Sequence, residues 1–226
     1  MPRRSPNIWD HPGTYEIENL AADPDGSLWA SMASVAPWAD RDVLDLGCGS
    51  GFHLPLFATT ARSVLGVEPN PDLVAMAARR TRRLANVEVT DGLAEHLPVP
   101  DASYDVVHAR WAYFLGPGCE PGLLEIDRVL TPGGTALIID NDPTRSTFGR
   151  WFSAGFPTVD AVAVEDFWAT RGWSREQIDM GWRFESREDL EAVVRLELPH
   201  AVAEAALADH EGLEVGYAVN LWWKQY

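Results

Sequence analysis

The sequence predicts an α/β fold in which a doubly wound, Rossmann-like and mostly parallel seven-stranded sheet carries helices on both faces. Three observations predict it: apolar runs alternate with helical segments from residue 41 onward, a glycine-rich turn follows the first run, and a long C-terminal run suits a closing strand. Continuous apolar strands alternating with helices are typical of parallel sheets covered on both faces. Right-handed crossovers then give the doubly wound arrangement.

The expected strands are short and apolar. They cover residues 43–46, 63–67, 87–90, 104–108, 135–140, 182–184 and 213–223. The last run alternates partly between apolar and polar positions, so we expect it to be a long antiparallel strand that closes the sheet.

Helical segments fill most of the spaces between these strands. They are expected at about 27–36, 50–60, 70–84, 121–130, 143–172 and 187–208, the last with a break at Pro199. Asn70 and Pro71 form a good helix start, because Asn accepts hydrogen bonds at the N-cap and Pro suits the first helical position. The rest of residues 1–30, rich in Pro, Gly, Asp and Asn, is expected to be an irregular arm.

A length of 226 residues suits one substantial domain. We expect a single domain over 1–226, with an N-terminal arm and helix (1–40), a ligand-binding core (41–142), and a helical insert with closing strands (143–226). The two cysteines, Cys48 and Cys119, make neither a disulfide framework nor a zinc motif, so no metal site is expected.

The net charge of −16, from 34 acidic residues against 18 Lys and Arg, argues against a nucleic-acid partner. Broad binding of DNA or RNA needs a cationic face. The dense run of Arg79, Arg80, Arg82 and Arg83 is interpreted as a solvated helix face. The sequence shows no secretory leader and no stretch of membrane-spanning length, so a cytoplasmic protein without membrane contact is expected.

The first strand runs into a turn with glycines at alternate positions, Gly47, Gly49 and Gly51. Glycine permits a tight turn and a close approach of a ligand to the backbone. Three consecutive strands also present an acid at their carboxyl ends: Asp45, Glu68 and Asp91. A carboxylate after the second strand can accept ribose hydroxyls, and a nucleotide-like ligand is expected across these strand ends.

Two common nucleotide motifs do not fit this turn. The dinucleotide fingerprint needs a glycine where Phe52 stands, and a phosphate-binding loop needs a Gly-Lys-Ser or Gly-Lys-Thr run that the turn lacks.

The sequence resembles the class I S-adenosylmethionine-dependent methyltransferases, in particular the small-molecule, type 11-like branch. The features that carry this resemblance are the run from Val43 to Gly51, the acidic Glu68, the Asp91-Gly92 pair, the strand at 104–107 and the turn at 130–134. The resemblance covers about residues 40–142. It implies S-adenosyl-L-methionine as the cofactor and transfer of a methyl group to a small-molecule acceptor whose reacting atom is O, N or C.

The resemblance also implies site residues. Gly47 and Gly49 would lie under the methionine part of the cofactor, and Glu68 would bind the ribose hydroxyls. Asp91, with the backbone of Gly92 and Leu93, would contact the adenine. The carbonyl of Ala109 would accept a hydrogen bond from the amino group of the cofactor. The full set of expected cofactor contacts is Tyr15, Asp45, Gly47, Cys48, Gly49, Glu68, Pro69, Asp91, Gly92, Leu93, Ala109 and Arg110.

Substrate contacts are expected from the arm, from the stretch after the fourth strand and from the insert after the fifth. The candidates are His53, Trp111, Tyr113, Phe114, Asn141 and Trp151. Most aromatic side chains at helical spacing are core residues, and His108 within a strand is interpreted as a packed, hydrogen-bonded histidine. No catalytic base is assigned.

Two other functions remain open. One is a noncatalytic regulator that binds S-adenosylmethionine, and the other is a nicotinamide-dependent oxidoreductase on the same fold. The Phe52 position and the expected Asp91 adenine contact count against the oxidoreductase. The small members of this family occur as monomers and homodimers, and the sequence does not distinguish between the two states.

Overall fold

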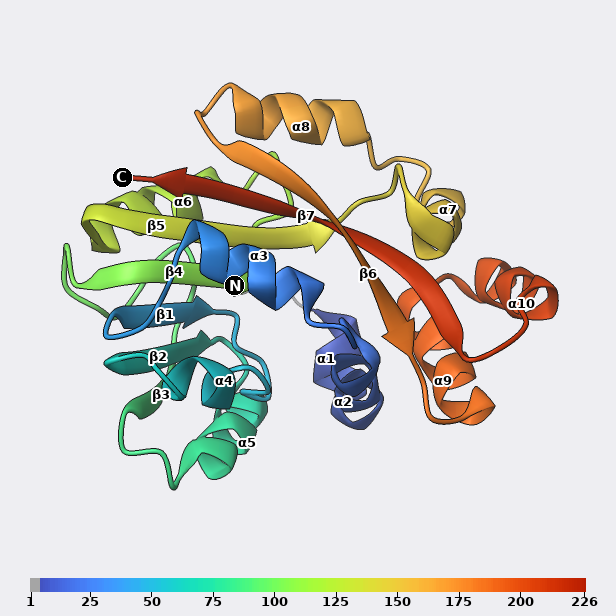
Figure 1. Cartoon of the computed structure of the whole chain (residues 1–226), viewed down its shortest axis with the longest axis horizontal. Helices are drawn as coiled ribbons and strands as arrows, with labels where there is room; N and C mark the ends of the chain where they lie inside the picture. The colour runs from blue at the N-terminus through green and yellow to red at the C-terminus, as the bar shows by residue number, and fades with distance from the viewer. Residues whose placement is uncertain (1–4) are drawn as a thin grey trace.

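The computed structural model describes residues 5–226 and contains the expected seven-stranded sheet, in the order β3-β2-β1-β4-β5-β7-β6 (Figure 1). The strands are β1 (Asp42–Leu46), β2 (Ser63–Glu68), β3 (Val87–Asp91), β4 (Tyr104–Arg110), β5 (Leu130–Asn141), β6 (Ser174–Arg183) and β7 (Glu214–Gln225). Strands β1 to β5 pair in parallel, and β7 runs antiparallel to both of its neighbours. The predicted fold class is therefore confirmed.

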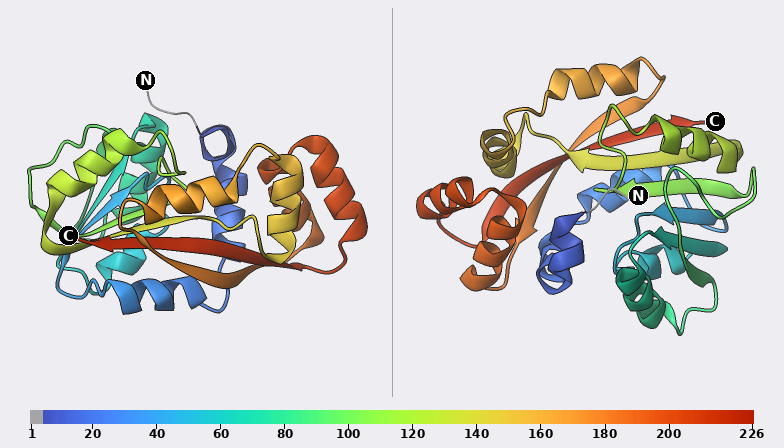
Figure 2. Two further views of the ribbon diagram at one scale, coloured as in Figure 1. Left: turned by 90° about the horizontal axis from the view of Figure 1, so that it is seen from above. Right: turned by 180° about the vertical axis from the view of Figure 1, so that it is seen from behind.

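Helices cover both faces of this sheet, as the left view of Figure 2 shows. On one face lie α3 (Ser27–Val35), α4 (Leu54–Ala58) and α5 (Pro71–Thr81), and on the other lie α6 (Glu120–Val129) and α8 (Ala161–Ala169). The side chains of successive strand residues point to opposite faces of the sheet. Val43 therefore packs with the first group of helices and Leu44 with the second, and both are fully buried. The Asn70 cap of α5 is confirmed, since its side chain accepts the Asp72 N–H at 2.9 Å.

The C-terminal part extends the sheet beyond the core. Here β6 and β7 continue past the other strands toward α7 (Ser146–Gly155), α9 (Arg187–Glu197) and α10 (His200–Asp209) (Figure 1). The expectation of a strand limited to 182–184 is wrong, because β6 spans ten residues. Its buried Ile178, Met180 and Trp182 alternate with more exposed neighbours, which is the period of a half-buried edge strand.

The N-terminal arm is helical, which corrects the expectation of an irregular segment. It forms α1 (Pro6–Asp10) and α2 (Pro12–Ala21), each with proline at the first position. Helix α2 packs on α9 and on β6, and Asp23 N–H donates to the Gly181 carbonyl at 2.9 Å. These contacts hold the arm beside the carboxyl ends of the core strands (Figure 1).

Most of the large aromatic side chains are core residues, as expected. Trp168, Trp182, Trp222 and Phe148 are at most 2% exposed. The two rings of Trp222 and Trp223 point to opposite faces of β7: Trp222 stacks on Trp168 at 5.8 Å, and Trp223 packs against the other core cluster. The tryptophan content is thus explained in large part by packing between the sheet and its helices.

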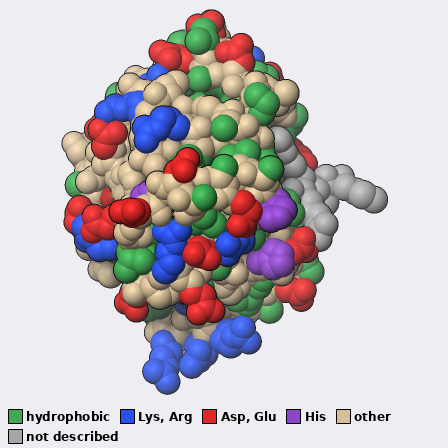
Figure 3. Space-filling model, turned by 90° about the vertical axis from the view of Figure 1, so that its right-hand side faces the viewer, with side chains coloured by type: hydrophobic (Ala, Val, Ile, Leu, Met, Phe, Trp, Pro, Cys, Tyr) green, Lys and Arg blue, Asp and Glu red, His purple; other side chains and the backbone are tan. Residues whose placement is uncertain are grey.

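Acidic and basic side chains stand close together on the face in Figure 3. Within the arginine run, Arg79, Arg82 and Arg83 are exposed, as expected. Arg80 is exposed as well, and in addition it forms an ion pair with Glu16 of α2 and donates to the Ser50 hydroxyl at 3.2 Å. Within residues 5–226, no helix combines the length and the apolar character that crossing a bilayer requires.

A buried carboxyl joins β5 to β7. Asp140 Oδ1 accepts hydrogen bonds from Asn220 Nδ2 at 2.8 Å and from Trp222 Nε1 at 3.1 Å. Burial raises the pKa of Asp140 to about 7, and the two donors only partly oppose that rise. The folded state therefore keeps a proton that the unfolded state releases near pH 4.

We predict that Asp140→Asn changes how stability depends on pH. Because the pKa of Asp140 is raised in the folded state, its protonated carboxyl contributes fully to stability below about pH 4. This contribution is lost as the pH rises through about 7. Asn keeps the accepting Oδ1 but does not ionise. As pH rises from about 4 to 7, the free energy of unfolding of the variant should therefore increase relative to that of the wild type, by at most about 1.4 kcal/mol per unit of pKa shift. Urea unfolding between pH 4 and 8 measures this difference.

Asp140→Leu is the matched comparison. It leaves the Asn220 and Trp222 donors without their acceptor, and should lower stability at every pH by about 1–3 kcal/mol. Parallel stability curves for the wild type and Asp140→Asn across this pH range would contradict the assignment.

Candidate active site

The glycine turn after β1 forms a backbone cradle at the carboxyl end of the sheet. Gly47 and Gly49 have φ of 72° and 56°, in the left-handed region that favours glycine. A Cβ on Gly47 would lie 2.6 Å from Ala112 Cβ, and one on Gly49 would lie 2.6 Å from Ile8 Cδ1. The turn is pinned to β2, because Gly47 N–H donates to the Val67 carbonyl at 2.8 Å.

The helix expected over 50–60 is shorter than predicted. Helix α4 begins only at Leu54, after Phe52 and His53, and Pro55 occupies its first turn. A five-residue helix has little macrodipole, so the turn itself, and not a helix N-terminus, offers the N–H groups here.

Glu68 at the end of β2 is buried beside this turn. Its Oε2 accepts the Gly49 N–H at 3.1 Å and its Oε1 accepts the Asn70 N–H at 3.0 Å. Burial raises the pKa of the Glu68 carboxyl, while these backbone donors favour its charged form. The carboxylate therefore holds the glycine turn and keeps further acceptor positions toward the cavity.

Asp45 at the end of β1 has a protein partner. Its Oδ1 lies 2.7 Å from Nδ1 of His108 on β4, and both side chains are buried. His108 also packs against Phe57 and Trp29, which agrees with the interpretation of a packed, hydrogen-bonded histidine.

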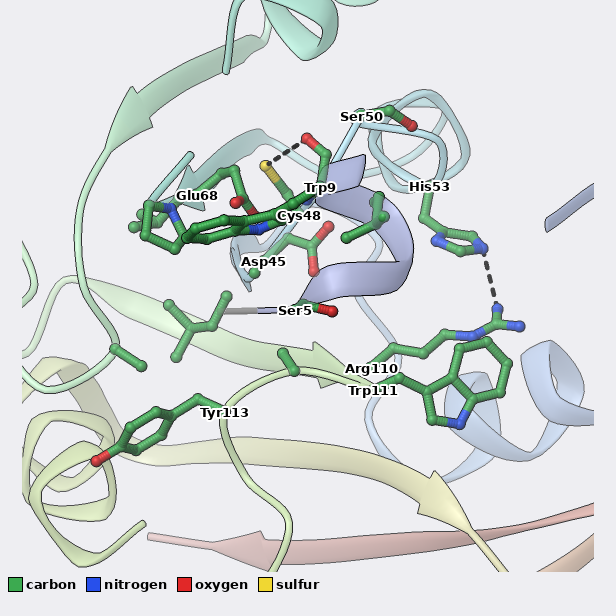
Figure 4. Close-up of a pocket in the computed structure, with 18 of the residues that line it drawn as sticks. Ser5, Trp9, Asp45, Cys48, Ser50, His53, Glu68, Arg110, Trp111 and Tyr113 are labelled. Atoms are coloured by element: carbon green, nitrogen blue, oxygen red, sulfur yellow. Dashed lines mark hydrogen bonds between the residues drawn. The ribbon is translucent and has the colours of Figure 1, made fainter. Parts of the chain in front are cut away.

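A cavity of about 340 Å³ lies at these strand ends (Figure 4). Most of the residues predicted from the sequence line it: Tyr15, Asp45, Gly47, Cys48, Gly49, His53, Glu68, Pro69, Gly92, Leu93, Arg110, Trp111 and Tyr113. Their roles toward a ligand stay predictions.

The other predicted residues do not line this cavity. Asp91 is exposed at the end of β3, and Ala109 and Phe114 are buried in the core. Asn141 accepts a hydrogen bond from the Tyr217 hydroxyl, and Trp151 packs edge-on against His210 at 5.3 Å. The insert after β5 thus contributes less to the cavity than expected.

The arm supplies lining residues that the sequence analysis missed. Ser5 to Trp9 and Asn19 line the cavity, and Ile8 lies on Gly49. The Trp9 indole lies against Glu68 and forms a hydrogen bond that favours the carboxylate (Figure 4). Prolines at residues 6 and 12 were the available signal, because proline is common at the first position of a helix.

Two buried carboxyls anchor the arm to the C-terminal helices. Asn7 Nδ2 donates to Glu197 Oε1 of α9 at 2.6 Å. Burial raises the pKa of both Glu18 on α2 and Glu197, and the charge of Glu197 raises the pKa of Glu18 further. The pair therefore favours protonated carboxyls where the two helices meet.

Arg110 and His53 form a second polar group in the cavity. Arg110 Nη1 donates to His53 Nε2 at 2.9 Å, and the guanidinium carbon lies 4.1 Å from the centre of the Trp111 ring. Burial, followed by the Arg110 charge, lowers the pKa of His53 well below its usual range. His53 is therefore neutral, and its accepting nitrogen is engaged by Arg110.

Comparison with known proteins agrees with this geometry. The family described as "Methyltransferase domain" matches residues 44–138. The chain is 35% identical over 118 residues to a fatty-acid O-methyltransferase of Mycolicibacterium smegmatis, covering 51% of this chain and 43% of the relative. It is 37% identical over 134 residues to a 2-phytyl-1,4-naphtoquinone methyltransferase of Synechococcus elongatus, covering 55% and 57%. The chain thus spans about half the length of these relatives.

A solved structure extends the likeness to most of the fold. The YcgJ protein of Bacillus subtilis superposes with a TM-score of 0.63 at 17% sequence identity, over 87% of this chain and 96% of the other. The fold of this chain thus resembles that of the YcgJ protein, and its core, residues 44–138, is similar to the methyltransferase domain.

Proposed function

We propose that the protein is an S-adenosylmethionine-dependent methyltransferase that acts on a small molecule. The observation that carries this proposal is the left-handed glycine turn held by the buried Glu68 carboxylate, with both lining one cavity at the sheet's carboxyl edge. Ligands of open α/β sheets bind at this edge.

The residues present fit the cofactor. A Cβ on Gly47 would meet Ala112 and one on Gly49 would meet Ile8 of the arm, so the turn admits only glycine at both positions, and a ligand that approaches Gly49 must share this space with Ile8. Glu68 would accept the ribose hydroxyls, and the backbone at Gly92 and Leu93 would face the adenine. Asp91 would need to turn inward from its exposed position to contribute.

When bound, S-adenosylmethionine supplies an electrophilic methyl group on a sulfonium centre. The chain's own contribution is to align the acceptor with it, and such positioning supplies at best about 7–11 kcal/mol of a barrier. His53 Nε2 accepts a hydrogen bond from Arg110, and His108 Nδ1 is bonded to Asp45 while its Nε2 is buried without a partner. We assign no general base, because the lone pair of His53 is engaged and the buried ring of His108 is packed against Trp29 and Phe57.

Aromatic and apolar side chains make much of the cavity wall and favour an acceptor with an apolar body. Ile8, Trp9, Phe52, Tyr113 and Leu115 are among them. The names of the two relatives give different compounds, a fatty acid and 2-phytyl-1,4-naphtoquinone, so the acceptor does not follow from likeness. The net charge of −16 supports a small molecule over a nucleic acid. We further propose a cytoplasmic monomer or homodimer.

We predict that S-adenosylhomocysteine binds and that Glu68→Gln weakens its binding roughly ten- to hundredfold, because a charge-assisted hydrogen bond is worth about 1.5–3 kcal/mol. Titration calorimetry measures both affinities. The control is Glu88→Gln, which changes an exposed acid on the neighbouring β3 and should bind as the wild type does. Equal affinities of Glu68→Gln and the wild type would refute the ribose assignment, and comparable binding of NADH would favour an oxidoreductase.

Methyl transfer itself is tested with labelled S-adenosylmethionine against a panel of phenols, amines, carboxylic acids and quinols. We expect turnover with at least one apolar acceptor and its loss in Glu68→Ala at low cofactor concentration, where weaker cofactor binding limits the rate. Tight binding of S-adenosylhomocysteine without turnover of any acceptor would instead support a noncatalytic regulator.

A further inference from the structure

Arg110 is a buried cation without an anionic partner. Its side chain belongs to a residue only 8% exposed, and it lines the cavity at the end of β4. Its Nε and Nη2 are buried and make no hydrogen bond, and no carboxylate of residues 5–226 lies within ion-pair distance of it. Buried donors of a charged group are costly to leave unpaired, so this arrangement calls for a ligand.

The acids and phenols that face Arg110 do not neutralise it. They are Glu18, Tyr15, Tyr217 and Asp23. Burial raises the pKa of Glu18, Tyr15 and Tyr217, which favours their uncharged forms at neutral pH. Asp23 forms no ion pair with Arg110: its Oδ2 accepts the Leu28 N–H at 3.1 Å at the start of α3, and its Oδ1 is buried without a hydrogen-bond partner.

One edge of the Arg110 guanidinium is buried without a hydrogen-bond partner. The ring of Trp111 covers one face, and Nη1 is used by His53. The two donors that remain, Nε and Nη2, lie side by side and point the same way, which is the fork that a carboxylate accepts with both oxygens.

The chain holds this platform in a strained conformation. Trp111 has φ of 47°, unusual for a bulky residue, and stacks on Tyr217 at 5.8 Å with an interplanar angle of 3°. The indole of Trp111 thus contacts both the guanidinium of Arg110 and the phenol of Tyr217. Trp111 Nε1 is also buried without a hydrogen-bond partner, and Trp111 lines the same cavity as Arg110.

We propose that Arg110 binds the carboxylate of an apolar acidic acceptor; this rests on the proposed function and names its substrate class. The cavity has two ends of opposite charge. Figure 4 shows Arg110, His53 and Trp111 grouped apart from Glu68, Cys48 and Asp45. The acidic end suits a cationic sulfonium and its ribose, and the Arg110 end suits an anion. The apolar wall of Ile8, Phe52 and Leu115 suits the rest of the acceptor.

The test compares octanoate with octanamide, which has the same length and no charge, by calorimetry with and without S-adenosylhomocysteine. The wild type should bind octanoate at least roughly tenfold more tightly than octanamide. Arg110→Gln should remove that preference and leave octanamide binding unchanged. Arg110→Lys, which keeps the charge but not the fork, should fall between them. Should the Gln variant not fold, Arg110→Lys carries the comparison.

The matched control is Arg171→Gln, since Arg171 also stacks on a ring, that of Phe167 at 3.8 Å, and does not line the cavity. It should keep the preference for octanoate. Equal binding of octanoate and octanamide to the wild type would overturn the proposal.

A second titration distinguishes the acceptor's carboxylate from that of the cofactor. Arg110→Gln should bind S-adenosylhomocysteine and 5′-methylthioadenosine, which lacks the amino-acid part, as the wild type does. Loss of affinity for the first compound alone would overturn the proposal and make Arg110 a cofactor contact. If the wild type did not bind S-adenosylhomocysteine, the proposed function would be refuted. The octanoate titration would still test whether Arg110 binds a carboxylate.

Discussion

The site depends on one constraint, the left-handed turn that leaves β1 and is bonded to the neighbouring strand. Gly47 N–H reaches the Val67 carbonyl, and Gly49 N–H reaches the Glu68 carboxylate, so both anchors of the turn come from the end of β2. Because the parallel pairing of β1 with β2 fixes where Glu68 stands, the sheet register sets the position of the turn. The cavity follows from that position, since its floor is this turn and its walls are the segments that leave the neighbouring strands.

The N-terminal arm closes the cavity from the side opposite the sheet. It is tied at separate points, by Glu16 to Arg80 of α5 and by Asn7 to Glu197 of α9. The first tie joins the arm to the core and the second joins it to the C-terminal extension, so α1 and α2 bridge the two parts. Ile8 and Trp9 lie directly over the glycine turn and Glu68. A ligand that uses the turn and the carboxylate must therefore share this space with the arm or displace it.

The sequence predicts the core well because its signals there are local. The apolar strands, the Asn70 cap and the glycine turn each depend on residues next to one another, and the structure has all three. The arm and β6 were mispredicted because their structure depends on tertiary contacts: α2 packs on α9, and β6 is completed by pairing with β7. Likewise the bonds from Asp45 to His108 and from Arg110 to His53 join residues more than fifty positions apart, and no local pattern reveals them.

These two bonds also restrict the chemistry of the acceptor. A hydroxyl or ammonium nucleophile must lose a proton when it is methylated, and a positioned base within reach would normally take it. Here the lone pair of His53 Nε2 is occupied by Arg110, whereas His108 is held by Asp45 at Nδ1 and its Nε2 is buried without a hydrogen-bond partner. A carboxylate is already ionised at neutral pH and has no proton to lose. The observation that favours an acidic acceptor is therefore the unpaired Nε and Nη2 edge of Arg110, while the Asp45–His108 pair keeps an Nε2 that no protein group engages among the described residues.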